Sequence, residues 1–98
     1  MKKVNIPLLN EYKVAETSSF IKKIQRKEYR KMHEKIKLLI YPQLRANPYF
    51  GPQIKKLKGE LKNIYRYRIA EYRLFYIIDE KRKMVFILEF HHRKDAYK

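Results

Sequence analysis

Basic and proton-carrying side chains gather on strand-like segments in the second half of this sequence. Arg66 and Arg68 lie on one segment and Arg73 on the next, and residues 91–97 then read HHRKDAY. Guanidinium forks match the oxygens of a phosphate, and imidazole exchanges protons near neutral pH. The pattern therefore favours binding of a phosphodiester with proton transfer beside it, carried by Arg66, Arg68, Arg73, His91, His92, Arg93 and Tyr97.

Other basic residues indicate a broader polyanion surface. One group precedes the first Arg-bearing segment and another lies on an expected helix: Lys55, Lys56, Lys58, Lys22, Lys23 and Arg26. Such faces bind nucleic acid through phosphate contacts that carry little sequence information. A simpler interpretation of the three strand arginines is a solvated surface that protects exposed strands. His91 and His92 have no third ligand at a suitable spacing, so no metal site is expected.

The composition indicates one basic domain without cysteine. We expect a single domain across residues 1–98, and its 25 Lys and Arg against 10 Asp and Glu give a formal net charge of +15, which attracts polyanions. A hydrophobic fraction of 45% is enough for a packed core. The absence of Cys excludes thiolate nucleophiles and Cys-based zinc sites. No apolar run suits a membrane span or a signal peptide, so we expect a cytoplasmic protein.

The first half of the sequence predicts a short strand followed by a helix. Residues 12–15 alternate between polar and apolar types, as a strand does. Thr17 or Ser18 can then cap a helix, because their hydroxyl oxygens accept hydrogen bonds from free backbone N–H groups. The apolar face of this helix is formed by Phe20, Ile21 and Ile24.

A second helical pattern follows, with its apolar face formed by Tyr29, Met32, Ile36, Leu39 and Ile40. The apolar residues of the two patterns do not continue one helical spacing. This predicts two helices, or one sharply bent helix, with the joint near residues 27–28. Pro42 lacks a backbone donor and is expected to end or kink the second helix. Two further prolines, Pro48 and Pro52, predict a loop after it.

Three strands are expected after this loop. They cover residues 64–70, 72–79 and 84–90, with Glu71 or its neighbours as the first turn and the charged residues 79–83 as the second. Such short connections require antiparallel neighbours. The fold class is therefore α+β, with a short N-terminal strand, two helices and a three-strand antiparallel meander, and with the helices packed on one face of the sheet.

Four motifs in this order resemble the RelE/ParE toxin superfamily of type II toxin–antitoxin systems. They read LKGEL at 57–61, YRYRI at 65–69, YRLFY at 72–76 and HRKDAY at 92–97. The resemblance covers about residues 11–98. It implies a toxin that is held inactive by a cognate antitoxin. RelE-like members cut messenger RNA, typically in the ribosomal A site, whereas ParE-like members share the fold but poison DNA gyrase without nuclease chemistry.

By motif position, the resemblance implies that the RNA-cutting residues are among the seven candidates above. Metal-free cleavage of RNA needs a deprotonated 2′-OH, neutralised phosphorane charge and a protonated 5′-oxygen. Arg66 and Arg68 are two residues apart and can share a strand face, which Arg73 can join from the next strand. Because arginine is a poor base, the proton-transfer candidates are His91, His92, Tyr97, Glu60 and Glu71. Neighbouring strand residues alternate, so one of the two histidines must face the core.

The preferred hypothesis is a RelE-like, metal-independent endoribonuclease that cleaves messenger RNA on the ribosome, with messenger RNA and the ribosome as partners and without a small-molecule cofactor. The alternative is a ParE-like inhibitor of DNA gyrase with no catalytic site, and a generic nucleic-acid-binding domain is third. The Arg-x-Arg and His-Arg-x-x-x-Tyr patterns favour the nuclease, since gyrase binding needs no acid–base groups. The expected partner is an acidic antitoxin that is partly disordered when free, and no membrane partner is expected.

Overall fold

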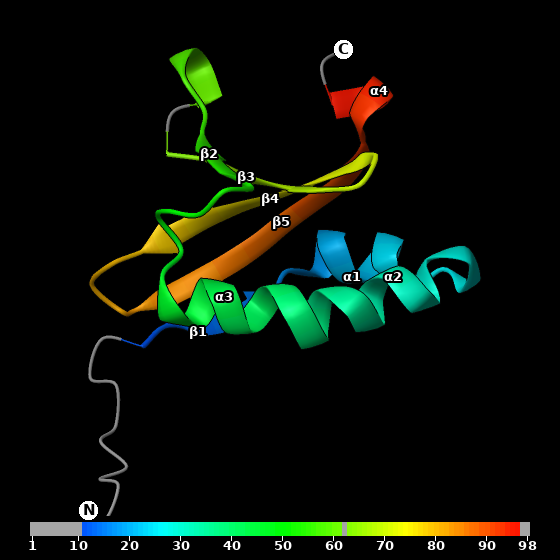
Figure 1. Ribbon diagram of the computed structural model, residues 1–98, viewed down its shortest axis with the longest axis horizontal. Coiled ribbons are helices and arrows are strands. Elements are labelled where there is room, and N and C mark those ends of the chain that lie inside the picture. Colours follow the sequence, from blue (N-terminus) through cyan, green and yellow to red (C-terminus); the bar gives the residue numbers. More distant parts are fainter. Residues whose placement is uncertain (1–10, 62, 97–98) are drawn as a thin grey trace, which may run out of the picture.

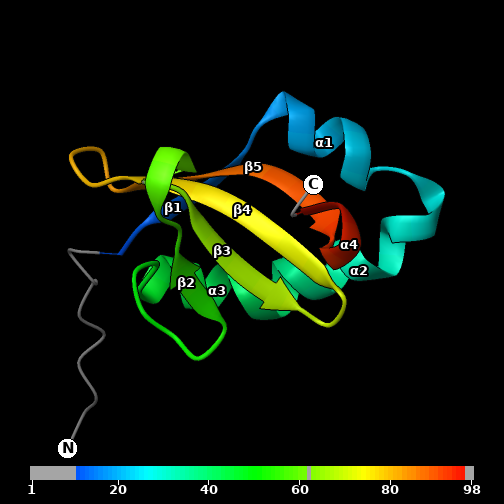
Figure 2. The same cartoon turned by 90° about the horizontal axis from the view of Figure 1, so that it is seen from above.

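The fold is a mixed five-stranded sheet with helices on one face (Figures 1 and 2). The computed structural model describes residues 11–61 and 63–96. The strands are β1 (Lys13–Glu16), β2 (Ile54–Lys56), β3 (Tyr65–Ile69), β4 (Tyr72–Asp79) and β5 (Met84–His92), in the order β1-β5-β4-β3-β2. β1 runs parallel to β5, and the other neighbours are antiparallel. The predicted α+β class, with an N-terminal strand and helices on one face, is confirmed.

The helical layer begins at the cap that the sequence predicts. Its elements are α1 (Ser18–Ile24), η1 (Lys27–Tyr29), α2 (Arg30–Lys35), η2 (Ile36–Ile40) and α3 (Tyr41–Ala46). Thr17 Oγ1 accepts a hydrogen bond from the Phe20 N–H and also donates one to Ile87 O at 2.7 Å, so the cap joins α1 to the sheet. The predicted joint is the 3₁₀ turn η1. Two short helices, η3 (Gly59–Leu61) and α4 (Arg93–Ala96), lie outside this layer.

Pro42 does not end the second helix, which continues to Ala46 through α3. The preceding segment η2 is a π-helix, in which Tyr41 N–H donates to Ile36 O, five residues back. Because of this wider turn, the helix needs no N–H donor at Pro42. The turn also changes the directions in which the side chains after Ile36 point, relative to a regular α-helix. As a result, Leu39, which the 3.6-residue pattern placed in the core, is 60% exposed.

The sheet contains one strand that the sequence did not predict. β2 is a three-residue edge strand whose Lys55 and Lys56 are exposed, so it has no apolar alternation to reveal it. β5 extends to His92, two residues further than expected. The two-residue turn at Ala70 and Glu71 joins β3 to β4 as predicted, with Ala70 at a φ of 49°.

Tyrosine rings and apolar side chains form the core between the sheet and the helices. Tyr65, Tyr67 and Tyr76 are buried. Their hydroxyls need partners once buried, and Tyr67 donates to Gln43 Oε1 at 2.6 Å while Tyr76 donates to Pro48 O at 2.7 Å. The first bond holds α3 against the sheet, and the second holds the loop that follows α3.

A carboxylate at the end of β1 joins three elements of the fold. Glu16 Oε2 accepts a hydrogen bond from the Tyr41 hydroxyl at 2.7 Å and lies 2.7 Å from His33 Nε2. Burial and this hydrogen bond raise the pKa of Tyr41. Since His33 is on α2 and Tyr41 on α3, the cluster holds the helical layer against the sheet and gives His33 a structural role.

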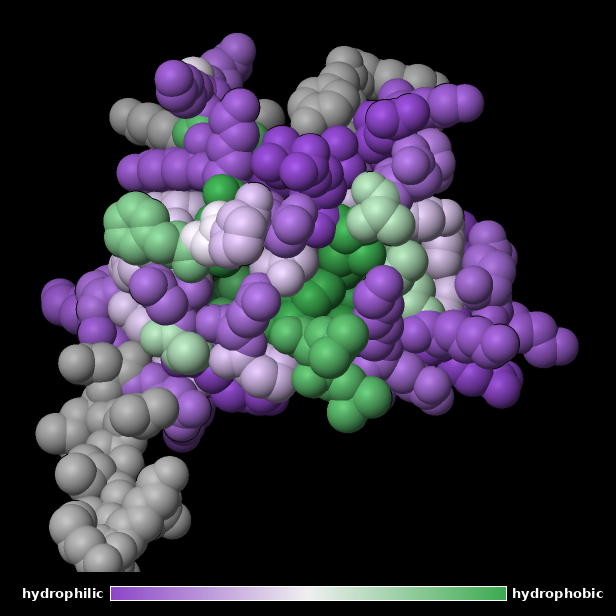
Figure 3. All heavy atoms as spheres, in the orientation of Figure 1, coloured by the Kyte–Doolittle hydropathy of each residue, from purple (hydrophilic) through white to green (hydrophobic). Residues whose placement is uncertain are grey.

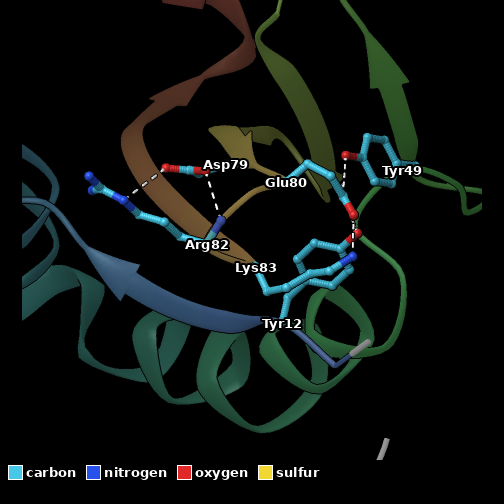
Figure 4. A network of polar contacts seen from close by, with 6 residues as sticks. All are labelled: Tyr12, Tyr49, Asp79, Glu80, Arg82 and Lys83. Atoms are coloured by element: carbon cyan, nitrogen blue, oxygen red, sulfur yellow. Dashed lines mark hydrogen bonds and ion pairs between the residues drawn. The ribbon is translucent and has the colours of Figure 1, made fainter. Parts of the chain in front are cut away.

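Glu80 forms a second polar cluster at the end of the sheet where β4 turns into β5 (Figure 4). Its carboxylate accepts hydrogen bonds from Lys83, Tyr12 and Tyr49, so the turn is joined to the start of β1 and to the loop after α3. These donors, Lys83 first, hold the pKa of the Glu80 carboxyl at about 2, below its ordinary value of 4.5. The Glu80 carboxylate therefore binds a proton less tightly in the folded state than in the unfolded state.

We expect Glu80→Gln to lower the unfolding temperature by a few degrees at pH 7. A carboxyl group whose pKa is depressed in the folded state stabilises the fold at pH values above its ordinary pKa of 4.5. This stabilisation is lost as the pH falls toward about 2. The difference between wild type and variant should therefore close between pH 4.5 and 2, as measured by calorimetry. Glu28→Gln is the control, because Glu28 forms no ion pair within the described residues. A difference in unfolding temperature between wild type and Glu80→Gln that does not depend on pH would contradict this account.

Candidate functional site

The face of the sheet opposite the helices brings the predicted arginines together. Arg68 on β3 pairs with Arg73 on β4, and Arg73 pairs in turn with His91 on β5. Directly paired residues point to the same face, so these three side chains form a row across the sheet. A second row, one step along the strands, contains Lys55, Arg66, Phe75 and Glu89. The expected shared face of Arg66, Arg68 and Arg73 is confirmed.

Arg73 is the most unusual residue of this face, because its charged side chain is only 8% exposed. It forms no ion pair within the described residues, and Nη1 donates only to the Tyr72 carbonyl at 3.1 Å. Arg73 Nε and Arg66 Nε are both buried without a hydrogen-bond partner in the described part of the chain. Burying an unpaired cation beside Arg68 is costly, and an anion bound here would remove that cost.

A β-bulge determines which histidine joins this row. The register of β4 against β5 shifts between Phe75 and Tyr76, where Leu88 is the extra residue of β5. Without the bulge, Arg73 would pair with Phe90, and His91 would lie on the core face beside Tyr72. With it, His91 lies on the arginine face, and its Nε2 is 3.3 Å from Glu89 Oε1.

His92 instead lies on the helix face, opposite Tyr72. Its ring meets the Tyr72 ring edge-on, with centroids 5.2 Å apart, and Nδ1 accepts a hydrogen bond from Lys94 N–H at 3.2 Å. The structure therefore separates the two histidines that the sequence left as alternatives. His92 contributes to the end of the sheet rather than to the row of Arg68, Arg73 and His91.

The C-terminal end of β5 approaches the turn between β3 and β4. Arg93 donates its backbone N–H to Glu71 O at 2.7 Å, and its Nε lies 2.8 Å from Glu71 Oε1. Arg93 is thus near the open face but already paired with a carboxylate. The predicted site residue Tyr97 lies outside the described residues.

Comparison with known proteins identifies the family. The family model described as the ParE toxin of the type II toxin-antitoxin system, parDE, matches residues 15–97. This chain belongs to that family. It is therefore the toxin component of a toxin–antitoxin system. No curated protein sequence matches the toxin at a significant level.

Solved structures of related toxins have the same fold. A chain in the RelBE2 toxin–antitoxin complex from Mycobacterium tuberculosis is 25% identical, has a TM-score of 0.68, and aligns over 85% of this toxin and 99% of that chain. The YoeB/ParE toxin from Agrobacterium tumefaciens is 26% identical, with a TM-score of 0.65 over 82% and 96% of the two chains. A chain of the archaeal RelE–RelB complex from Pyrococcus horikoshii is 28% identical, with a TM-score of 0.62 over 88% and 99%.

The other basic residues predicted to bind RNA or the ribosome do not form one surface in the toxin. Lys55 pairs with Arg66 and shares the arginine face, whereas Lys56 pairs with Tyr65 and lies 5.9 Å from the centre of that ring. Lys58 is exposed in the following loop. The remaining three, Lys22, Lys23 and Arg26, lie on α1 or directly after it, in the helical layer that covers the other face. They cannot contact a phosphate that is bound at Arg73.

The open face also contains two residues that the sequence did not single out. Phe75 lies beside the His91 ring, with centroids 5.9 Å apart, and Glu89 is the partner of His91. The alternation of β4 placed Phe75 with Arg73, but Glu89 joins them only through the bulge.

Within the described residues, no cluster of three His, Asp or Glu side chains could hold a metal ion. No described helix has the length and apolarity to span a membrane.

Proposed function

We propose that this toxin is a metal-independent endoribonuclease that cleaves messenger RNA on the ribosome in the cytoplasm. The main support is the buried Arg73 guanidinium, whose Nε has no partner in the described chain and which lies between Arg68 and His91. Similarity to chains of RelB–RelE complexes agrees with this choice.

Arg66, Arg68 and Arg73 supply positive charge to the scissile phosphate. As the 2′-oxygen attacks, negative charge grows on the non-bridging phosphate oxygens. Donors that are already fixed at those oxygens stabilise the transition state without a cost of reorganisation. Arg73 is fixed by burial, and Arg68 pairs directly with it. The unsatisfied Nε groups of Arg66 and Arg73 would each gain an acceptor when the substrate binds.

His91 carries the proton that is transferred during cleavage, and Glu89 positions the His91 ring. The imidazole is in direct register with Arg73, so a phosphate held at Arg73 would lie beside this ring. Glu89 near Nε2 fixes the ring and leaves Nδ1 for the substrate. Phe75 offers a ring against which a base can stack. Tyr97 remains a candidate for aligning the 2′-OH or stacking on a base, and Arg93 would join the site only if its pair with Glu71 opens.

Inhibition of DNA gyrase is the second candidate function, because the matching family model is that of the ParE toxin. Gyrase inhibition is a protein-binding activity and needs no proton-transfer group. It gives no role to a buried arginine in register with a histidine. The two functions therefore predict different effects for substitutions on the open face.

Incubating the toxin with programmed ribosomes and mapping the new 5′ ends of the messenger RNA tests the proposal. We expect discrete cuts in the messenger RNA, with no effect on DNA supercoiling by purified gyrase in a parallel reaction. Intact messenger RNA together with blocked supercoiling would establish the second candidate instead.

A further inference from the structure

Glu89 places a carboxylate among the basic and aromatic residues of the open face. It pairs directly with Phe75, in the row beside that of Arg73, and its side chain is 47% exposed. Figure 3 shows hydrophilic side chains gathered along this side of the sheet, away from the helices. A carboxylate here repels the phosphate that the arginines attract. Phosphate binding therefore gives Glu89 no role, and its position suits another part of the substrate.

The sheet surface becomes apolar on the side of Phe75 that lies away from Arg73. Ile77 follows Phe75 on the same face of β4 and pairs with Phe86 on β5. Phe75, Ile77 and Phe86 are each partly exposed. Two residues along a strand span about 7 Å, which is similar to the reach from a phosphate to the base of its own nucleotide. A phosphate at Arg73 would therefore place a flanking base over Phe75.

The hydrogen-bonding groups of Glu89 distinguish one base from another. An ionised carboxylate accepts hydrogen bonds and donates none. Guanine presents two adjacent donors, N1–H and the N2 amino group, which match the two carboxylate oxygens. Adenine and cytosine present one amino group beside a ring acceptor, and uracil presents N3–H between two carbonyls, so each sets a lone pair against the carboxylate. Because hydrogen bonds to an ionised acceptor are the stronger ones, guanine fits Glu89 best.

We propose that Phe75 and Glu89 form a subsite that selects a guanine next to the scissile phosphate. Phe75 supplies a stacking surface for any base, and Glu89 supplies the discrimination. Glu89 Oε1 already lies 3.3 Å from His91 Nε2. Since a carboxylate offers about four acceptor positions, Glu89 can hold the His91 ring and the guanine together. This inference rests on the proposed function for the identity of the substrate, but the base preference can be measured without cleavage.

Binding of two short RNAs tests the subsite. The probes are the pentanucleotides UUGUU and UUAUU with a 2′-O-methyl group on every ribose, so that no 2′-oxygen can attack. Their Kd values are measured by nuclear magnetic resonance titration of the toxin. We expect wild type to bind the guanine probe about 10-fold more tightly, as a bidentate base contact allows. Equal Kd values for the two probes would overturn the subsite.

Glu89→Gln should move the preference from guanine toward adenine. The amide of Gln offers one donor and one acceptor, which match N1 and the N6 amino group of adenine. Phe75→Leu should weaken both probes to a similar extent, because stacking tolerates any base. Glu28→Gln is the matched control, because Glu28 lies on η1 in the helical layer, and it should keep both wild-type Kd values. Circular dichroism verifies that each variant is folded.

Cleavage on programmed ribosomes separates base selection from the positioning of His91. The messengers differ only in a guanine or an adenine on either side of the bond that is cut. Glu89→Gln should lower the guanine-to-adenine ratio of single-turnover rates by about 10-fold, whereas a role confined to His91 would slow both messengers equally. An unchanged ratio in Glu89→Gln would overturn the inference and leave the nuclease function intact. A toxin that prefers the guanine probe but cuts no messenger would refute the proposed function alone.

Discussion

Arg73→Ala is expected to reduce single-turnover cleavage of ribosome-bound messenger RNA by about 100-fold or more. Removing one fixed donor from a developing oxyanion typically costs a factor of about 100 to 1,000. Arg73 is buried, without an ion-pair partner in the described chain, and lies between Arg68 and His91, so its fork is held at the centre of the row. Arg73→Lys should recover only part of the rate, because an ammonium keeps the charge but loses the paired planar donors.

Two measurements separate this chemical effect from damage to the fold. Thermal unfolding shows whether Arg73→Ala and Arg73→Lys remain folded at the assay temperature. Arg82→Ala is the matched arginine control, because Arg82 is exposed and its Nε lies 3.8 Å from Asp79 at the far end of β4. We expect Arg82→Ala to cut at the wild-type rate. A folded Arg73→Ala variant that also cuts at that rate would place the active site elsewhere.

His91→Gln should also reduce cleavage by about 100-fold, whereas His92→Gln should leave the rate within a few-fold of wild type. General acid–base catalysis by a positioned side chain typically contributes a factor of about 100 or more. His91 is in register with Arg73, and His92 packs against Tyr72 on the other face.

Comparison of these two variants tests the bulge at Leu88 as well as the chemistry. An unbulged register would place His91 on the core face, and then His91→Gln would act mainly on stability. If His92→Gln lost the activity and His91→Gln kept it, the assignment would be reversed.

Local features of the sequence were sufficient to predict the class of fold and the arginine cluster. The cap at Thr17 and the two-residue turn at Glu71 are determined by neighbouring residues, and both are present in the structure. That turn sets the register of β3 against β4, which is why Arg66, Arg68 and Arg73 could be placed on one face from spacing alone.

Features that depend on tertiary packing could not be predicted in this way. The bulge at Leu88 involves no Gly or Pro, yet it selects His91 over His92. The π-helix before Pro42 leaves Leu39 60% exposed, although its spacing in the sequence suits the core. β2 depends on the exposed edge of β3 rather than on its own composition, because its three residues include two exposed lysines and show no apolar alternation.

A messenger RNA with a single 2′-deoxy substitution gives the most direct test of the central claim, which is that the open sheet face cleaves RNA by means of the substrate's own 2′-OH. The substitution is placed on the 5′ side of the bond that wild-type toxin cuts in a programmed ribosome. We predict that the all-ribose messenger is cut there in a single turnover and that the deoxy messenger stays intact at that bond. Equal cleavage of the two messengers would contradict the mechanism, and cleavage of neither would contradict the nuclease function itself.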